Sequence, residues 1–505
     1  MRVLCFGLDG ADYDLVRELM AQGRLATLSR LSREGAFGPL RSTIPPLTPV
    51  AWSSFLTGLN PGSHGIFGFS ANPQRAVSRL ESAANRAGVP LWRFLGAAGI
   101  RSAFVTVPFT YPPEPLAGLL VTGWGGPQRP EIFPVTARDR IFAAHPDLVT
   151  AQSPTGWWKD LDAFTQRLID HVGEIADVCL LAMELEPDLG LLCVDFMSSD
   201  IAGHLTWHRL DPTHPAHDES GDELVRVYEA VDRACGELIE QAIWLYGEEP
   251  TVVVLSDHGM KPTHWLFRTN RWLEQAGYLR YRPVSSNRPA RRGERDEPPR
   301  AEIDFDATRA YSLGYGGQIY LADVTGEANT ALLAELGAAL ADVTHPETRE
   351  PLFEVRTKHE LYRGPFLARA PELILLPRDE RVHADSSRQL WRETFQRNER
   401  LAVGGSTNYS GQHALTGVLA AAGPGICPAD VPDGTEIASI PATLLALLGL
   451  SAQLEAAPIE TLLAGKDASE RRAVAPGTRA PTEAPVYSTE EEQEMVRRLR
   501  ELGYE

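Results

Sequence analysis

Residues 251–260 read Thr-Val-Val-Val-Leu-Ser-Asp-His-Gly-Met, and this stretch decides the fold. The aliphatic run that follows Pro250 predicts a strand buried on both faces, as in the middle of a parallel sheet. The run leads directly into Asp257, His258 and a glycine. Open α/β sheets bind ligands at the carboxyl ends of their strands, and an adjacent Asp and His can hold a divalent cation there. An isolated Asp-His pair is more often a solvated turn, so the interpretation depends on partners elsewhere in the chain.

The rest of the chain alternates strand and helix patterns, which is typical of a doubly wound α/β fold. The predicted strands are 3–8, 102–107, 189–194, 317–322, 373–376 and 417–422. The predicted helices are 12–34, 48–56, 90–98, 161–184, 220–246, 440–448 and 489–502. We expect one catalytic domain over 1–465, with 112–160 as a covering insertion rich in Pro, Gly and Trp and 285–300 as an exposed loop. Residues 466–505 are expected to form a linker and a C-terminal helix.

Charge and composition limit the function classes. The 505 residues include 48 basic and 67 acidic side chains, for a net charge of −19. Such a surface disfavours binding to a nucleic-acid duplex or an anionic membrane, and phosphate chemistry would need a local positive charge such as a metal ion. Apolar runs are strand-sized, no signal peptide is evident, and the five cysteines form no Cys-x-x-Cys pair. We therefore expect a cytoplasmic protein with reduced thiols and no membrane span.

Four further side chains are candidate partners of Asp257 and His258. Asp9 closes the first predicted strand, and His413 precedes a later apolar strand. Asp200 and His204 are four residues apart, so in a helix they lie on one face and can share a metal ion. Three Asp and three His near strand ends make a metal site the better interpretation. Other candidates have weaker patterns: a structural role is favoured for Asp195, and a polar loop for His208, His214 and His217.

Thr48 is the candidate nucleophile. Pro45 and Pro46 stiffen the approach to it, and Pro49 suits the first turn of a helix, which predicts Thr48 as the N-cap. A hydroxyl there lies beside the positive end of the helix. An ordinary capping threonine has the same local pattern, but a metal ion on the hydroxyl would make Thr48 a nucleophile.

These residues resemble the alkaline phosphatase superfamily. The motifs are Asp9, the block from Thr48 (Thr-Pro-Val-Ala-Trp-Ser-Ser-Phe-Leu-Thr-Gly-Leu-Asn-Pro-Gly-Ser-His-Gly-Ile), Asp200-x-x-Gly-His204, Asp257-His258-Gly and His413. They are most similar to the type I phosphodiesterase/nucleotide pyrophosphatase branch and its phosphohydrolase or phosphomutase relatives. The similarity runs in order through residues 1–450. It implies an αβα sandwich with a mostly parallel central sheet.

The resemblance also implies a site with two divalent metal ions, with zinc as the usual metal and manganese as the alternative. Asp200, His204 and His413 would hold one ion. Asp9, Asp257 and His258 would hold the other, with Thr48 coordinated to it. Thr48 would attack a small-molecule phosphate ester and form a phosphothreonine intermediate.

One departure affects the expected substrate. The branch carries an Asn shortly after Ser-His-Gly-Ile, where this chain has Gly65-Ile-Phe-Gly-Phe69. The nearest amides are Asn60 and Asn72, which become the candidate substrate-binding residues. A phosphodiesterase is favoured, and a phosphomonoesterase or phosphomutase is the alternative. A degenerate scaffold that binds metal without catalysis is the non-enzymatic alternative.

Overall fold

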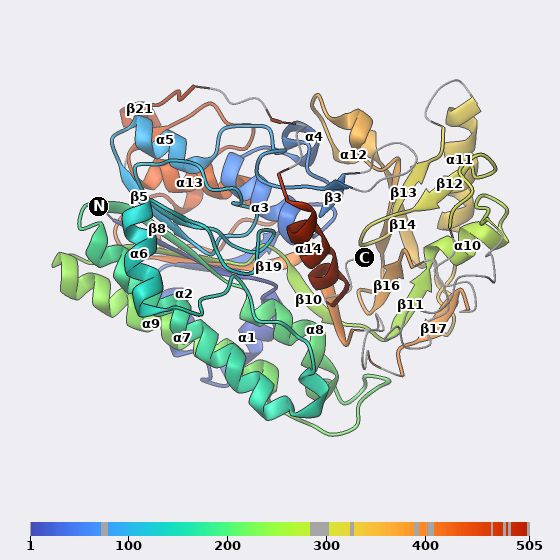
Figure 1. Cartoon of the computed structure of the whole chain (residues 1–505), viewed down its shortest axis with the longest axis horizontal. Helices are drawn as coiled ribbons and strands as arrows, with labels where there is room; N and C mark the ends of the chain where they lie inside the picture. Colours follow the sequence, from blue (N-terminus) through green and yellow to red (C-terminus); the bar gives the residue numbers. More distant parts are fainter. Residues whose placement is uncertain are drawn as a thin grey trace.

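The computed structural model describes residues 2–71, 79–282, 302–323, 328–387, 393–399, 401, 409–465, 468–477, 481–482 and 486–501. Its centre is an eight-stranded sheet in the order β2-β19-β9-β1-β8-β5-β6-β7 (Figure 1). The strands from β9 to β6 in this order are parallel, whereas β19 and β7 run antiparallel to their neighbours. Their bounds are β1 (Val3–Leu8), β2 (Ala36–Arg41), β5 (Arg101–Val105), β6 (Gly118–Val121), β7 (Ile132–Phe133), β8 (Leu189–Phe196), β9 (Thr251–Leu255) and β19 (Thr416–Ala422).

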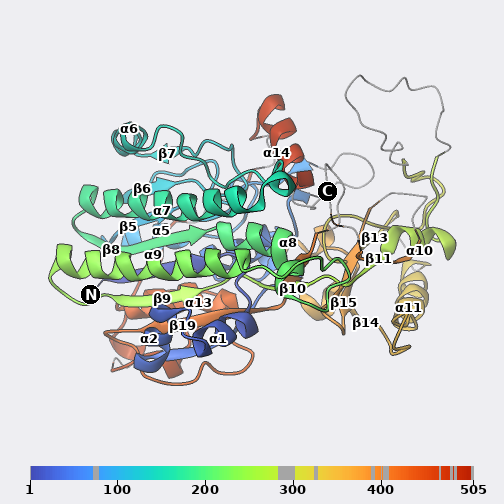
Figure 2. The ribbon, with the colours of Figure 1, turned by 90° about the horizontal axis from the view of Figure 1, so that it is seen from below.

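Helices cover both faces of this sheet, because its central strands are apolar on both sides. In β1, Phe6 and Leu8 face one core cluster and Val3 and Cys5 face the other. Figure 2 shows the long helices α7 and α9 lying side by side across the sheet. The first cluster includes residues of α1 (Tyr13–Ala21), α2 (Ala26–Glu34), α7 (Leu161–Leu185), α8 (Ser198–Leu210) and α9 (Glu223–Tyr246). The second includes residues of α3 (Thr48–Thr57), α5 (Leu91–Ala97) and α13 (Ile440–Leu447), so the αβα class predicted from the sequence is confirmed.

A second lobe, residues 265–397, has its own hydrophobic core (Figure 1). Its antiparallel sheet has the order β12-β13-β15-β14, and a smaller sheet has the order β16-β11-β17. The bounds are β11 (Trp265–Arg268), α10 (Thr269–Gln275), β12 (Ala310–Ser312), β13 (Gln318–Leu321), α11 (Ala328–Ala341), β14 (Phe353–Thr357), α12 (Lys358–Leu361), β15 (Leu373–Pro377), β16 (Val382–Asp385) and β17 (Phe395–Arg397). The chain enters this lobe through β10 (Gly259–Pro262) and returns through β18 (Gly411–Ala414), and these two strands pair antiparallel.

Short elements complete the structure. They are α4 (Pro61–His64), β3 (Ser70–Ala71), β4 (Arg79–Leu80), α6 (Val135–Ala144), β20 (Leu450–Ser451), β21 (Arg472–Ala473) and α14 (Thr489–Glu501), with 3₁₀ turns at Trp157–Lys159, Leu367–Arg369, Ile437–Ser439, Glu460–Leu462 and Ala468–Glu470. Met495 and Leu499 of α14 are buried in the first core cluster, so the C-terminal helix packs on the lobe that contains the central sheet. Among the residues placed by the structure, no helix is long and apolar enough to cross a membrane.

Several expectations from the sequence require correction. Residues 112–160 are not merely a covering insertion, because β6 and β7 lie within them and extend the central sheet. The single helix expected over 12–34 is two helices, since the chain turns at Gly23 with φ +75°. The strands expected at 317–322 and 373–376 exist as β13 and β15, but they belong to the second lobe. The exposed loop expected at 285–300 lies outside the described residues.

Candidate active site

The first group of candidate ligands lies at the carboxyl ends of β1 and β9. These strands are parallel neighbours with Gly7 opposite Leu255, so Asp9 and Asp257 both follow the paired region by two residues. One ligand atom each from Asp9, Asp257 and His258 lies within 4.8 Å of the others. The His258 Nε2 atom is 3.3 Å from Asp257 Oδ2, 3.7 Å from Asp9 Oδ1 and 3.3 Å from the Thr48 hydroxyl. We call Asp9, Thr48, Asp257 and His258 the Thr48 half-site.

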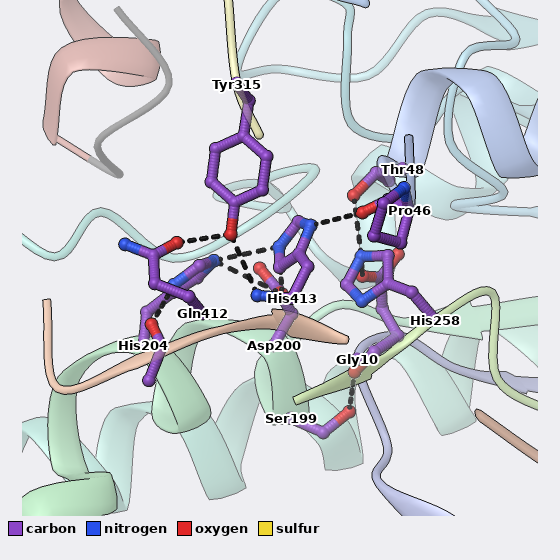
Figure 3. A network of polar contacts seen from close by, with 12 residues as sticks. Gly10, Pro46, Thr48, Ser199, Asp200, His204, His258, Tyr315, Gln412 and His413 are labelled. Atoms are coloured by element: carbon purple, nitrogen blue, oxygen red, sulfur yellow. Dashed lines mark hydrogen bonds and ion pairs between the residues drawn. The ribbon is translucent and has the colours of Figure 1, made fainter. Parts of the chain in front are cut away.

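The second group comes from α8 and β18. Asp200 and His204 are one helical turn apart, with 3.5 Å between Asp200 Oδ1 and His204 Nε2. The His413 Nε2 atom lies 3.2 Å from the same carboxylate oxygen and 3.0 Å from His204 Nε2. We call Asp200, His204 and His413 the His413 half-site. Because Asp200, His258 and His413 also form a group within 4.8 Å, the two half-sites are contiguous (Figure 3). The side chains of all seven residues are inaccessible to solvent.

The three imidazole rings are oriented by backbone carbonyls. Nδ1 of His204 lies 2.9 Å from Gly411 O, Nδ1 of His258 lies 3.0 Å from Gly259 O, and Nδ1 of His413 lies 2.8 Å from Pro46 O. A carbonyl oxygen can only accept, so each Nδ1 carries a proton and each Nε2 atom faces the cluster. Metal-ligating histidines are usually held in this way.

Two of the three rings have lowered pKa values. Burial, reinforced by the nearby His413 ring, lowers the pKa of His258 well below its usual value. Burial, with His204 as the neighbouring ring, does the same to the pKa of His413. Both rings are therefore neutral at physiological pH. The Nε2 atoms of His204 and His413 lie 3.0 Å apart, which places two possible ligand atoms side by side.

The buried carboxylates of the cluster would be stabilised by a nearby positive charge. Within the described part of the chain, Asp9 Oδ1, Asp257 Oδ2 and both side-chain oxygens of Asp200 are buried and accept no hydrogen bond. Burial raises the pKa of Asp9 well above its usual value, and repulsion from Asp257 raises it further. Burial and Asp200 likewise raise the pKa of Asp257. Neutral imidazole nitrogens beside unsatisfied carboxylate oxygens form a donor set that suits Zn²⁺ or Mn²⁺.

Three contacts that sequence reasoning missed hold the Thr48 half-site in place. Trp52 Nε1 donates to Asp9 Oδ2 at 3.0 Å, and the backbone N–H of Gly10 donates to Asp257 Oδ1 at 3.2 Å. The Ser199 hydroxyl donates to the Asp9 carbonyl at 2.7 Å. Trp52 follows Thr48 by one helical turn, so its position in the motif was a signal that it shares the face of Thr48.

Gly10 is required by its backbone and by a close approach. Its φ is +68°, and a Cβ atom at this position would lie 3.0 Å from Asp200 Oδ1. A side chain here would disturb the turn that places Asp9 beside α8.

Thr48 is the first residue of α3, and Leu47 is the N-cap. The predicted N-cap role is therefore wrong by one position. Pro49 does lie in the first turn, as predicted, and the whole helix is buried. The hydroxyl still lies at the positive end of α3.

The other candidate residues fall outside this cluster. The Asn60 amide caps α4, accepts from Gly62 N and Arg363 N, and donates to Ser63 and Glu455, which is a structural role. Asn72 lies outside the described residues. Asp195 is the penultimate residue of β8, and burial raises its pKa, but it belongs to neither metal-compatible group.

The competing histidines also have structural explanations. His214 Nδ1 accepts from Ala216 N at 3.0 Å, and His217 Nδ1 lies 2.7 Å from the His208 carbonyl. None of these three histidines joins a metal-compatible group among the residues that the structure places.

Comparisons with known proteins give one matching family and several structures of similar fold. A profile described as type I phosphodiesterase/nucleotide pyrophosphatase matches residues 3–399. No curated protein sequence matches the chain. Phosphonoacetate hydrolase from Sinorhizobium meliloti 1021, in complex with phosphonoformate, has a similar structure with a TM-score of 0.52 at 15% identity, covering 89% of this chain and 95% of that one.

Two mammalian structures are similar as well. Human ectonucleotide pyrophosphatase/phosphodiesterase 5 has a TM-score of 0.54 at 14% identity, covering 92% of this chain and 100% of that one. The murine protein, in an inactive form with a threonine replaced by alanine and in complex with AMP, has a TM-score of 0.55 at 14% identity with the same coverage. At these identities the structures show a shared fold.

Proposed function

The chain belongs to the type I phosphodiesterase/nucleotide pyrophosphatase family, and from this premise we propose that it cleaves phosphodiesters at a dinuclear metal centre with Thr48 as the nucleophile. The family predicted from the sequence motifs is thereby confirmed, and phosphoester hydrolysis is the activity that it supports. The observation that carries the finer proposal is the buried cluster of three Asp and three His, one member of which, His258, lies 3.3 Å from the Thr48 hydroxyl.

In this proposal each half-site holds one divalent cation, with Zn²⁺ as the first choice and Mn²⁺ as the second. Asp200, His204 and His413 hold one ion; Asp9, Asp257 and His258 hold the other, next to Thr48. When bound, two such ions stabilise the negative charge that develops on the attacking and leaving oxygens of an in-line displacement.

The chain's own groups perform the bond changes. Thr48 gives up its hydroxyl proton to solvent and Oγ1 attacks phosphorus, forming an Oγ1–P bond while the bond from phosphorus to the leaving oxygen breaks; one proton returns from solvent to the leaving oxygen, so this half-reaction is proton-neutral. The leaving oxygen takes up a proton and departs as an alcohol. Water then attacks the phosphothreonine, the Oγ1–P bond breaks, and Thr48 regains its hydroxyl. The Nδ1–H contacts of the three histidines keep the ligand geometry fixed throughout.

Burial supports the role of Thr48 beyond its position. Thr48 is fully buried, and its hydroxyl lies next to His258 Nε2. The hydroxyl is therefore shielded from bulk water, and its environment is set by the cluster and by the start of α3.

The test combines metal analysis with substrate assays on one preparation. The chelated and the zinc- or manganese-loaded protein are assayed with bis(4-nitrophenyl) phosphate, 4-nitrophenyl phosphate and a nitrophenyl ester of a nucleoside monophosphate. The nucleotide ester is included because the murine relative is found with AMP. Loaded protein should cleave diesters with the higher kcat/KM, and activity that survives complete chelation would refute the metal-dependent mechanism.

Variants separate catalysis from metal binding. Thr48→Ala should lower kcat by at least about 10³-fold with near-normal metal content, whereas Thr48→Ser should retain measurable turnover. Thr57→Ala is the matched control, because Thr57 is buried on the same helix and its hydroxyl donates to Ser53 O at 2.7 Å. A Thr48→Ala variant that keeps the wild-type rate removes Thr48 from this role. Two bound ions without turnover of any ester would favour the scaffold alternative.

A further inference from the structure

Tyr315 is a residue of the second lobe that reaches the candidate metal centre. It lies in the turn between β12 and β13, within Gly314-Tyr-Gly-Gly317, where all three glycines have φ between +70° and +79°. These left-handed positions let the backbone turn sharply and direct one large side chain toward the lobe that contains the central sheet. Figure 3 shows the ring beside His413 and Gln412.

The phenol oxygen has polar contacts with β18, the strand that carries His413. It accepts the backbone N–H of His413 at 2.8 Å and donates to the Gln412 side-chain carbonyl. The ring centroid lies 4.9 Å from that of His413 and 4.8 Å from that of His383, which is also in the second lobe. Tyr315 is buried. The residue therefore contacts both the backbone and the ring of one candidate ligand.

The position of His413 explains why such a contact matters. His413 lies on β18, which pairs with β10 alone among the described strands, so the ladder is only two strands wide. A short two-stranded ribbon is weakly stable by itself. The phenol satisfies the His413 N–H as a third strand would, while Pro46 O orients the ring through Nδ1.

We propose that Tyr315 is a positioning residue for His413, through which the second lobe sets the metal affinity of the His413 half-site. The inference rests on the proposed function, because it takes His413 to be a metal ligand. Tyr315 touches neither ion nor substrate in this proposal; it fixes the location and ring orientation of the side chain that does. The lobe that contains the central sheet supplies six of the seven cluster residues from its own elements, whereas His413 lies on the strand by which the chain returns from the second lobe.

The test measures ion binding directly. Zn²⁺ affinities are determined by competition with a chromophoric chelator, and the visible absorption of the Co²⁺-loaded protein reports ligand geometry at each site. Tyr315→Phe keeps the ring and removes the hydroxyl. It should lower the affinity for one of the two ions by about 10–100-fold and change one absorption band of the Co²⁺-loaded protein. Tyr320→Phe is the matched control, since Tyr320 is buried in the same lobe and its hydroxyl donates to Gln318 at 2.9 Å. This variant should bind both ions as the wild type does.

A second variant guards against misfolding of the first. Gln412→Met removes the acceptor of the Tyr315 hydroxyl and should also lower the affinity for the ion that Tyr315→Phe affects. Wild-type affinities and spectra in a folded Tyr315→Phe variant, or in Gln412→Met if Tyr315→Phe does not fold, would overturn the inference while leaving the proposed function intact. A wild-type protein that binds no divalent cation would overturn both.

Discussion

Replacing Asp257 by asparagine should stabilise the metal-free protein and, at the same time, prevent it from binding two ions. In the metal-free state the carboxylates of Asp9 and Asp257 approach to within 4.8 Å inside a cluster that excludes solvent. Two unit charges at that distance repel by about 3.5 kcal/mol at an effective dielectric constant of 20. Protonation, which the raised pKa values favour, reduces this repulsion, so we expect a gain from Asp257→Asn of about 1–3 kcal/mol at neutral pH.

The sign of the pH dependence follows from the direction of the shift. The pKa of Asp257 is raised on folding, so its contribution to stability is fully present below the unfolded pKa and is lost as the pH rises through the folded pKa. The advantage of Asp257→Asn over the wild type should therefore be absent in acid and grow toward neutral and alkaline pH. The assay is the thermal unfolding midpoint of chelated protein across this pH range.

The matched control is Asp232→Asn. Asp232 is also a buried aspartate with a pKa raised by burial, but it accepts the backbone N–H groups of Thr27 and Leu28 at 2.9 and 2.8 Å. Losing one acceptor should destabilise the protein by about 1–3 kcal/mol. Added Zn²⁺ should raise the unfolding midpoint of the wild type above that of Asp257→Asn. The reason is that an ion at 100 times its Kd stabilises the wild type by about 2.7 kcal/mol per site. If metal-free Asp257→Asn unfolds below the wild type, repulsion between buried carboxylates is not what destabilises the metal-free cluster.

Three further predictions follow from the same geometry. Trp52→Phe removes the donor to Asp9 and should lower the Zn²⁺ affinity of the Thr48 half-site by about 10–100-fold in a titration. An unchanged affinity would contradict the role of the indole N–H. Metal affinity should rise with pH because protons compete for Asp9 and Asp257, and calorimetry in buffers of different ionisation enthalpy should detect proton release. Gly10→Ala should lower the free energy of unfolding by at least about 1 kcal/mol, measured by denaturant titration, since φ is +68° and the new Cβ would crowd Asp200; a neutral effect would show that the turn relaxes freely.

The central part of the fold could be predicted from the sequence because burial on both faces leaves an unmistakable pattern. Val252–Leu255 is apolar without interruption, and its strand lies in the middle of the sheet as expected. The strands β6 and β7 span four and two residues in a stretch rich in Pro and Gly, so they are too short to show a period. The separate sheet of the second lobe was missed for another reason: a strand pattern does not say which strand it pairs with.

The candidate site divides in a similar way. The sequence indicated the seven residues of the two half-sites, because residue type and position at strand ends are local signals, and the structure brings all of them together. Their role as ligands and nucleophile stays a prediction. Tyr315 carried no such signal, since it contacts His413 from 98 positions away through a loop that only the packed lobes bring near.

The order of the half-sites along the chain has a consequence for synthesis. Every residue of the Thr48 half-site precedes the second lobe, whereas His413 follows it. At about 5–20 residues per second, a ribosome needs roughly 10–30 seconds to travel from His258 to His413. During this interval the nascent chain carries one complete half-site and two waiting residues, Asp200 and His204. A cation captured during this interval would be bound by the Thr48 half-site alone. The His413 half-site can be completed only after the second lobe has emerged and the chain has returned through β18.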